Sequence, residues 1–205
     1  MKKTRILKSL FAIAIVGGIS SSVVASPTSE YASTVIGFSS EYNPSPGSWS
    51  ASQALGAPNT VSYGDIDTAW APGPLNGTLE NITLGFLTPT YSTGAMVRET
   101  YGNGFVYQID ALDSSNILHT VWTGVDPSLP GTPVDFSVSW AQTSFLTTGL
   151  KIYTNTDHDL NAWEEIDAVQ LVGDTQRQNN VPEPASLMLF GVALAGLGFS
   201  RRKQL

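Results

Sequence analysis

The pattern that most limits how this chain can fold is a period-two alternation of apolar and polar residues along its middle part. The alternation is clearest in three short segments, 82–86, 107–111 and 135–140. Successive side chains of a β-strand point to opposite faces, so each segment would have one face for a core and one for solvent. Helical periodicity is scarce in this region. The pattern therefore predicts an all-β domain.

Other segments have the composition of strands, and the gaps between them are rich in Gly, Pro, Asn, Asp and Ser, which favour turns. Eight or so short strands without intervening helices favour two packed antiparallel sheets. We therefore predict a jelly-roll β-sandwich over residues 26–173, followed by a polar linker at 174–180. The additional strands are expected at 33–38, 94–99, 117–122, 149–154 and 166–172.

Charge is distributed unevenly along the chain. The 205 residues have a formal net charge of −7, but residues 26–180 hold three basic residues against sixteen acids, a net charge of −13. Such an acidic region repels phosphate backbones, so nucleic acid is not an expected partner. Cysteine is absent, which excludes disulfides and thiolate metal sites.

The first 25 residues have the order of a secretory signal peptide. Four basic residues come first, an apolar run from Leu10 to Val16 follows, and small residues lead to Ala25. The apolar run is short for a membrane span of about 20 residues, which favours removal after Ala25 over a retained anchor. The mature protein is therefore expected outside the cytoplasm.

The last 25 residues, 181–205, combine a short motif, an apolar stretch and a basic cluster. The uncharged stretch 185–200 would form a helix of about 24 Å, less than the roughly 30 Å of a bilayer core. Positive charge after the stretch favours leaving this end in the cytoplasm. The motif is Val181, Pro182, Glu183 and Pro184, and the cluster includes Arg201 and Arg202.

These terminal features closely resemble the PEP-CTERM sorting signal of Gram-negative bacteria. The resemblance implies transient anchoring in the inner membrane by the C-terminal helix and cleavage by an exosortase. It also implies a cell-surface or extracellular-matrix location associated with exopolysaccharide and biofilm production. The alternative is a plain C-terminal anchor, which predicts the same topology but retention of residues 185–205.

Four internal segments resemble the discoidin, or galactose-binding-like, family: 49–59, 68–70, 84–86 and 163–169. The resemblance implies an eight-stranded jelly roll whose loops at one end bind glycans, lipids or proteins. It also implies a structural calcium ion, shared by a loop aspartate and a glutamate at the start of the last strand. Glu164 or Glu165 would match that glutamate, whereas the expected loop aspartate is replaced within residues 54–57.

Calcium requires several converging oxygen ligands. Two groups of residues are candidates, although Ala162 and Ala168 exclude a standard EF-hand loop in the second. The alternative is that these acids are solvated turn residues. The first group is Asp65, Asp67 and Thr68, and the second is Asp157, Asp159, Asn161, Glu164 and Glu165.

Aromatic residues in loop-like segments are the candidates for ligand contact, because an exposed ring can stack on a sugar while acids accept hydrogen bonds from its hydroxyls. We predict this role for Trp49, Tyr101 and Trp122. The alternative is burial, which we expect for Trp70 and Trp163, the two tryptophans within the family motifs.

No catalytic motif is present, and we expect a protein that is not an enzyme. The leading hypothesis is an exported protein that binds extracellular polysaccharide or a surface glycan. A structural or adhesive matrix protein that acts by protein contact or self-association is the alternative, and a divergent glycan-processing enzyme is a third possibility.

Overall fold

A computed structural model of the chain describes residues 27–178. The predicted signal peptide, the sorting motif and the C-terminal helix lie outside these described residues. Within 27–178, no helix is long and apolar enough to cross a membrane.

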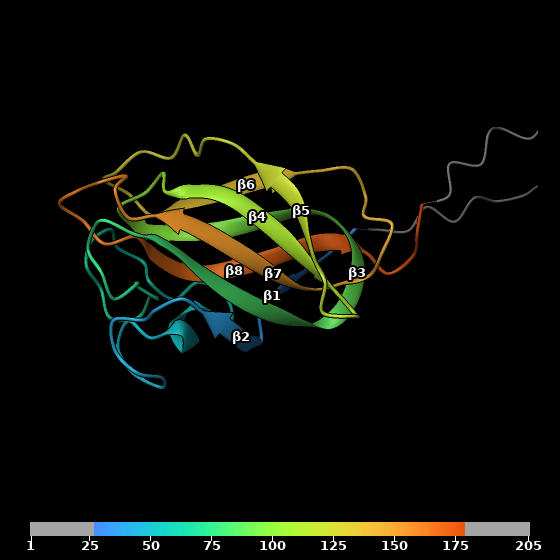
Figure 1. Ribbon diagram of the computed structural model, residues 1–205, viewed down its shortest axis with the longest axis horizontal. Coiled ribbons are helices and arrows are strands. Elements are labelled where there is room, and N and C mark those ends of the chain that lie inside the picture. Colours follow the sequence, from blue (N-terminus) through green and yellow to red (C-terminus); the bar gives the residue numbers. More distant parts are fainter. Residues whose placement is uncertain (1–26, 179–205) are drawn as a thin grey trace, which may run out of the picture.

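The described chain folds into two antiparallel sheets (Figure 1). One sheet has the order β2-β3-β7-β4-β5, and the other has the order β1-β8-β3-β6. The predicted all-β class and antiparallel sandwich are therefore confirmed. The strands are β1 (Thr28–Tyr31), β2 (Thr34–Phe38), β3 (Leu79–Tyr101), β4 (Val106–Asp113), β5 (Leu118–Thr123), β6 (Val134–Ser139), β7 (Thr147–Asn155) and β8 (Glu165–Asp174).

Strand β3 belongs to both sheets. Its first half pairs with β2 and β7, and its second half pairs with β8 and β6. Figure 1 shows the strand curving from one layer into the other. The expectation of two separate strands at 82–86 and 94–99 is therefore wrong. The bend lies at Leu87, Thr88 and Pro89, where all three side chains are exposed.

The bend avoids the usual cost of a proline inside a strand. Pro89 lacks an N–H group and cannot donate to a sheet ladder. The pairing of β3 with β7 shifts between Gly85 and Thr90, so no ladder bond is required there. The N–H groups of Leu87 and Thr88 instead donate to the Glu30 carboxylate at 2.9 and 3.0 Å.

Alternation predicted the core correctly along most strands. Ile82 and Leu84 of β3, Ile109 of β4 and Ile152 of β7 are fully buried and belong to one apolar cluster between the sheets. The predicted strand at 117–122 is observed one residue later as β5. Two elements were not predicted, β1 and the short 3-10 helix η1 (Ala51–Ala54).

Trp70 fixes the long segment between η1 and β3 against the last strand. Its side chain is completely buried, as expected, and its backbone forms an isolated bridge with Ile166 of β8. Its indole N–H donates to the carbonyl oxygen of Ser40 at 3.2 Å. This anchoring brings the segments that precede β3 close to the start of β8, where the candidate site lies.

Candidate functional site

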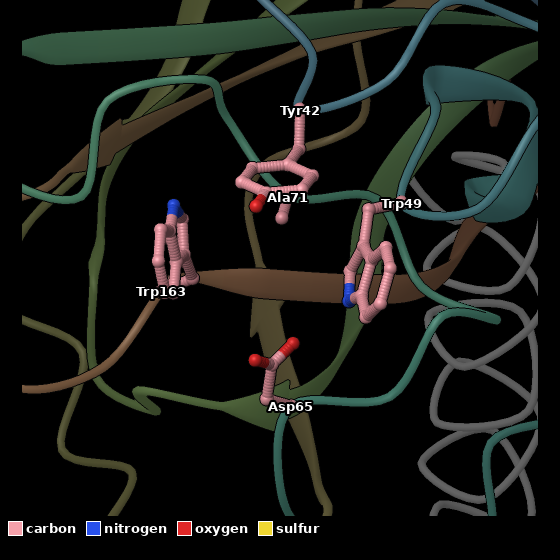
Figure 2. Close-up of a pocket in the computed structure, with 5 residues that line it drawn as sticks. All are labelled: Tyr42, Trp49, Asp65, Ala71 and Trp163. Carbon is pink, nitrogen blue, oxygen red and sulfur yellow. The ribbon is translucent and has the colours of Figure 1, made fainter.

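Three connecting segments of the sandwich together form a small aromatic pocket. Tyr42 and Trp49 come from the segment between β2 and η1, Asp65 and Ala71 from the segment between η1 and β3, and Trp163 from the segment before β8. These five residues line an open cavity of about 240 Å³. In Figure 2, Trp49 and Trp163 stand on opposite sides, Tyr42 spans the space between them, and the Asp65 carboxylate faces Tyr42 across the cavity.

The rings of the aromatic pocket meet edge to face. The centroid of Tyr42 lies 5.6 Å from that of Trp49 and 5.5 Å from that of Trp163, with interplanar angles of 69° and 81°. Both distances lie in the range at which aromatic pairs attract each other. The rings therefore support one another and leave a space between them.

The Trp49 backbone has a φ of 55°, in the left-handed region that bulky residues rarely adopt. Its N–H donates to the carbonyl oxygen of Asp67 at 3.1 Å, and its indole N–H donates to Glu165 Oε1 at 3.2 Å. Residues in such strained conformations persist when their surroundings fix them, and they concentrate at ligand sites. The structure therefore holds this ring in one orientation.

Glu41 organises the loop that carries the first two rings. Its carboxylate accepts hydrogen bonds from the N–H groups of Ser45 and Ala51, both at 2.9 Å. Burial acts to raise the Glu41 pKa, but these backbone bonds, together with one from the Ser45 hydroxyl, outweigh it and hold the pKa below its ordinary value. Glu41 therefore remains ionised and ties the loop to η1.

Glu165, the first residue of β8, is bonded to one wall of the aromatic pocket through the Trp49 indole. Its carboxyl group is fully buried and accepts hydrogen bonds from Trp49, from the Ile66 N–H at 3.3 Å and from the Thr100 hydroxyl at 3.4 Å. Burial raises its pKa to about 9, and the neighbouring Asp65 carboxylate raises it further against the opposing backbone bond. Glu165 is therefore neutral at physiological pH.

Glu164, the preceding residue, has a different environment. Its side chain is fully buried, and neither carboxyl oxygen has a hydrogen-bond partner among the described residues. Burial is the main cause that raises its pKa to about 8, and the charges of Asp159 and Asp157 add to the effect. A buried carboxyl group without partners is costly unless it is neutral or meets a cation.

The structure divides the predicted calcium ligands differently from the two predicted groups. Asp65 neighbours Glu165, whereas Asp157 and Asp159 influence Glu164. Thr68 bonds to the Thr60 hydroxyl at 2.6 Å, Asp67 accepts from the Ser48 hydroxyl at 3.1 Å, and Asp159 accepts from the Asn161 N–H at 3.0 Å. Within 27–178, no group of three or more His, Asp or Glu side chains has the geometry of a metal site.

Of the three predicted ligand-contacting aromatics, Trp49 alone lines the aromatic pocket. Tyr101 packs edge to face on Tyr63 at 5.5 Å, and Trp122 packs on Phe136 against the core. The expectation that Trp163 lies in the core is wrong, because it is only partly buried and lines the pocket. Tyr42 was not predicted, since its sequence neighbours give no sign of the rings it meets.

Another buried acid, Glu99, lies near the same end of β3 as Glu165, since Tyr101 pairs with Glu165 and Glu99 pairs with Ile166. Glu99 is fully buried, and its carboxyl group accepts from the Gly104 N–H at 2.9 Å. Burial, followed by the nearby Asp126, raises its pKa to about 10. Asp126 is itself buried and accepts from the Ser128 N–H at 2.9 Å. Glu99 is therefore neutral at physiological pH and belongs to the interior rather than to the aromatic pocket.

Residues 180–203 match the PEP-CTERM protein-sorting motif. The match confirms the predicted sorting signal and implies export and processing by an exosortase. No curated protein sequence matches the chain.

The fold resembles those of several solved structures. A chain from the structure of reduced XRCC1 bound to the DNA polymerase β catalytic domain has a TM-score of 0.54 and 12% identity, over 71% of this chain and 99% of that one. This likeness shows a shared fold. Truncated AlyQ with CBM32 and alginate lyase domains has a TM-score of 0.49 and 14% identity, over 80% of this chain and 38% of that one. Allantoicase from Saccharomyces cerevisiae has a TM-score of 0.48 and 10% identity, over 68% of this chain and 40% of that one.

Proposed function

We propose that this exported, exosortase-processed protein binds extracellular carbohydrate in its aromatic pocket. One observation carries the proposal: three separate segments gather three aromatic rings and a carboxylate around one open cavity. Aromatic side chains pack on the apolar faces of sugars, and carboxylates accept hydrogen bonds from their hydroxyls. The sorting motif supports an extracellular setting, where polysaccharide is abundant.

A binding experiment with three variants tests this proposal. The purified full chain is titrated with exopolysaccharide from its host, and Trp49→Ala and Trp163→Ala are each expected to weaken binding at least about tenfold, because each removes one wall of the pocket. Trp122→Phe is the control, since Trp122 packs on Phe136 away from the pocket. Absence of binding, or equal binding by all variants, contradicts the proposal. Because no catalysis is proposed, the polysaccharide should keep its length.

A structural role through protein contact is the second candidate function. A groove follows the sheet of β1, β8, β3 and β6, and Tyr31, Met96, Val138 and Gln170 are among its lining residues. Sedimentation of the full chain at increasing concentration tests this role. Concentration-dependent oligomers that form without any sugar, together with no glycan binding, would favour it over carbohydrate recognition.

For calcium, we propose Glu164 as the remaining candidate ligand among the described residues, since no group of three acids there has the geometry of a metal site. The Glu164 carboxylate fits a cation, because it is buried with both oxygens unpartnered among the described residues. Glu165 fits less well, since its oxygens already accept from Trp49, Ile66 and Thr100. A calcium ion would neutralise the buried charge and join the segment before β8 to its neighbours.

A further inference from the structure

The shape of the aromatic pocket distinguishes between classes of ligand. A sugar ring stacks on a flat aromatic face that is free of neighbours. Here the three rings stand at 69° and 81° to one another and enclose a space from several sides (Figure 2). Such an enclosure fits a compact, rounded group better than a flat ring.

The electrostatics of the aromatic pocket favour a positive ligand. The faces of aromatic rings are negative and attract cations within about 6 Å of the ring centroid. Asp65 adds a carboxylate opposite Tyr42 (Figure 2), and no basic side chain is among the five lining residues of the described chain. The surrounding region, 26–180, has sixteen acids against three basic residues and remains strongly negative even with its buried glutamates neutral, which attracts cations from solution.

None of the three lysine and arginine residues of the described domain lines the aromatic pocket, and two of them, Arg98 and Lys151, have partners elsewhere. Arg98 is paired with Asp135 at 3.0 Å, and Lys151 lies over the Tyr153 ring at 4.8 Å. The buried Glu165 carboxyl group accepts a hydrogen bond from the Trp49 indole N–H. This bond lies in the plane of the ring and does not involve its π-face. Asp65 and the rings of Trp49 and Trp163 line the open cavity, where a ligand can contact them.

We propose that the aromatic pocket binds an ammonium group, either methylated or protonated, with Asp65 as its counter-charge. Three rings and one acid are the arrangement by which proteins hold quaternary ammonium groups. The group can belong to a free small cation or to an amino sugar of a polysaccharide. Binding of an amino sugar rests on the proposed function. In that case the glycans that bind are polymers with free amino groups.

The test compares charged and neutral ligands of the same shape. The full chain, in a non-ionic detergent without choline groups, is titrated with choline and with 3,3-dimethylbutan-1-ol at constant ionic strength, and tryptophan fluorescence is recorded. We expect choline to bind about tenfold more tightly than the neutral alcohol, since cation–π attraction is lost in the alcohol. Equal affinities, or binding of neither ligand, would overturn the proposal.

Two matched variants locate the binding. Asp65→Asn keeps the size of the side chain but removes its charge, and it is expected to weaken choline binding about fivefold to tenfold while leaving the affinity for the alcohol unchanged. Asp67→Asn removes a charge two residues away that accepts from Ser48 and does not line the pocket. If both variants lower the affinity for choline equally, general charge attraction explains the binding, and the assignment of the ammonium site to the aromatic pocket is wrong.

A second pair of ligands separates this inference from the proposed function. Oligomers of glucosamine and of N-acetylglucosamine of equal length differ in whether they carry free amines. Preference for glucosamine supports both proposals. Choline binding without binding of any oligomer supports the ammonium site and contradicts carbohydrate recognition. Equal binding of both oligomers without choline binding supports carbohydrate recognition and overturns the ammonium site.

Discussion

Glu99 shows how one buried acid links the stability of this protein to pH. Its folded-state pKa of about 10 lies well above the ordinary 4.5, so the folded protein binds a proton that the unfolded chain releases above pH 4.5. The stabilisation is complete below pH 4.5 and declines as the pH rises toward 10. One such proton changes the free energy of unfolding by about 1.4 kcal/mol per pH unit.

We expect Glu99→Gln to flatten this decline. The amide resembles the protonated acid in shape and still accepts from the Gly104 N–H, but it does not ionise. The variant should equal the parent near pH 4 and exceed it at pH 8, as measured by urea unfolding at both values. Asp67→Asn, at an exposed position, is the control, and it should change the free energy of unfolding by the same amount at pH 4 and at pH 8. A parent whose stability rises between pH 5 and pH 8 in parallel with the variant would contradict this assignment.

Calcium should raise the unfolding midpoint of the full chain if Glu164 is a ligand. Millimolar calcium is expected to raise the midpoint by several degrees, because a ligand that binds only the folded state stabilises it. Glu164→Gln should abolish the rise, and magnesium should give a smaller one, since it demands a stricter geometry. An unchanged midpoint of the parent protein would contradict calcium binding at Glu164.

Sequence reasoning at the scale of residues identified single members of the site rather than the site itself. Trp49 was found because it lies in a segment rich in Gly, Pro and Ser. Asp65 was predicted only as a calcium ligand, and its place beside Tyr42 and Trp163 was not predicted, because these residues converge only after three connecting segments pack together. Trp163 was expected in the core because it stands in one of the segments that resemble the discoidin family.

Among the elements, β3 differs most from the expectation. The alternating patterns on either side of its bend were recognised, but the segment between them, with Pro89 and a run of polar residues, is typical of a turn. The structure uses that segment to carry one strand from sheet to sheet. Strand β1 was missed since its four residues, half of them exposed, lack an apolar alternation. The other strands were predicted to within a few residues.

Gly94 of β3 should tolerate no side chain, because β6 lies too close. A methyl group there would lie 2.6 Å from the carbonyl oxygen of Val138. We expect Gly94→Ala to lower the free energy of unfolding by about 1–3 kcal/mol, the usual cost of overpacking. Gly37→Ala on β2 is the control, since nothing lies within 4 Å of the added methyl group, and it should be neutral or slightly stabilising. Equal effects of the two substitutions on urea unfolding would show that the close approach of β6 does not exclude a side chain at position 94.

For the molecule as a whole, residues 27–178 contain both sheets and the apolar cluster between them. We expect a fragment limited to 27–178 to unfold in one cooperative transition, at the same midpoint as the full chain, by circular dichroism. A midpoint lower by more than about 5 °C would show that the flanking segments contribute to the stability of the sandwich.

Processing at both ends should be visible in the mass of the protein isolated from its host. The mature form is expected to begin at Ser26 and to lack residues 185–205, since the PEP-CTERM motif covers 180–203. Alanine substitution of Pro182, Glu183 and Pro184 together should preserve the C-terminal residues. Native protein that retains residues 185–205 would contradict exosortase processing.

Strand β8 connects the aromatic pocket to the C-terminal segment, since Trp163 lies just before its first residue and Asp174 is its last. It is hydrogen-bonded on both edges, to β1 and to β3. A mechanical load between a bound ligand and residue 178 would therefore act along this strand. Because the ladder bonds are perpendicular to it, they would share the load in shear instead of opening one after another. We therefore expect a high unfolding force when the sandwich is pulled from these two points.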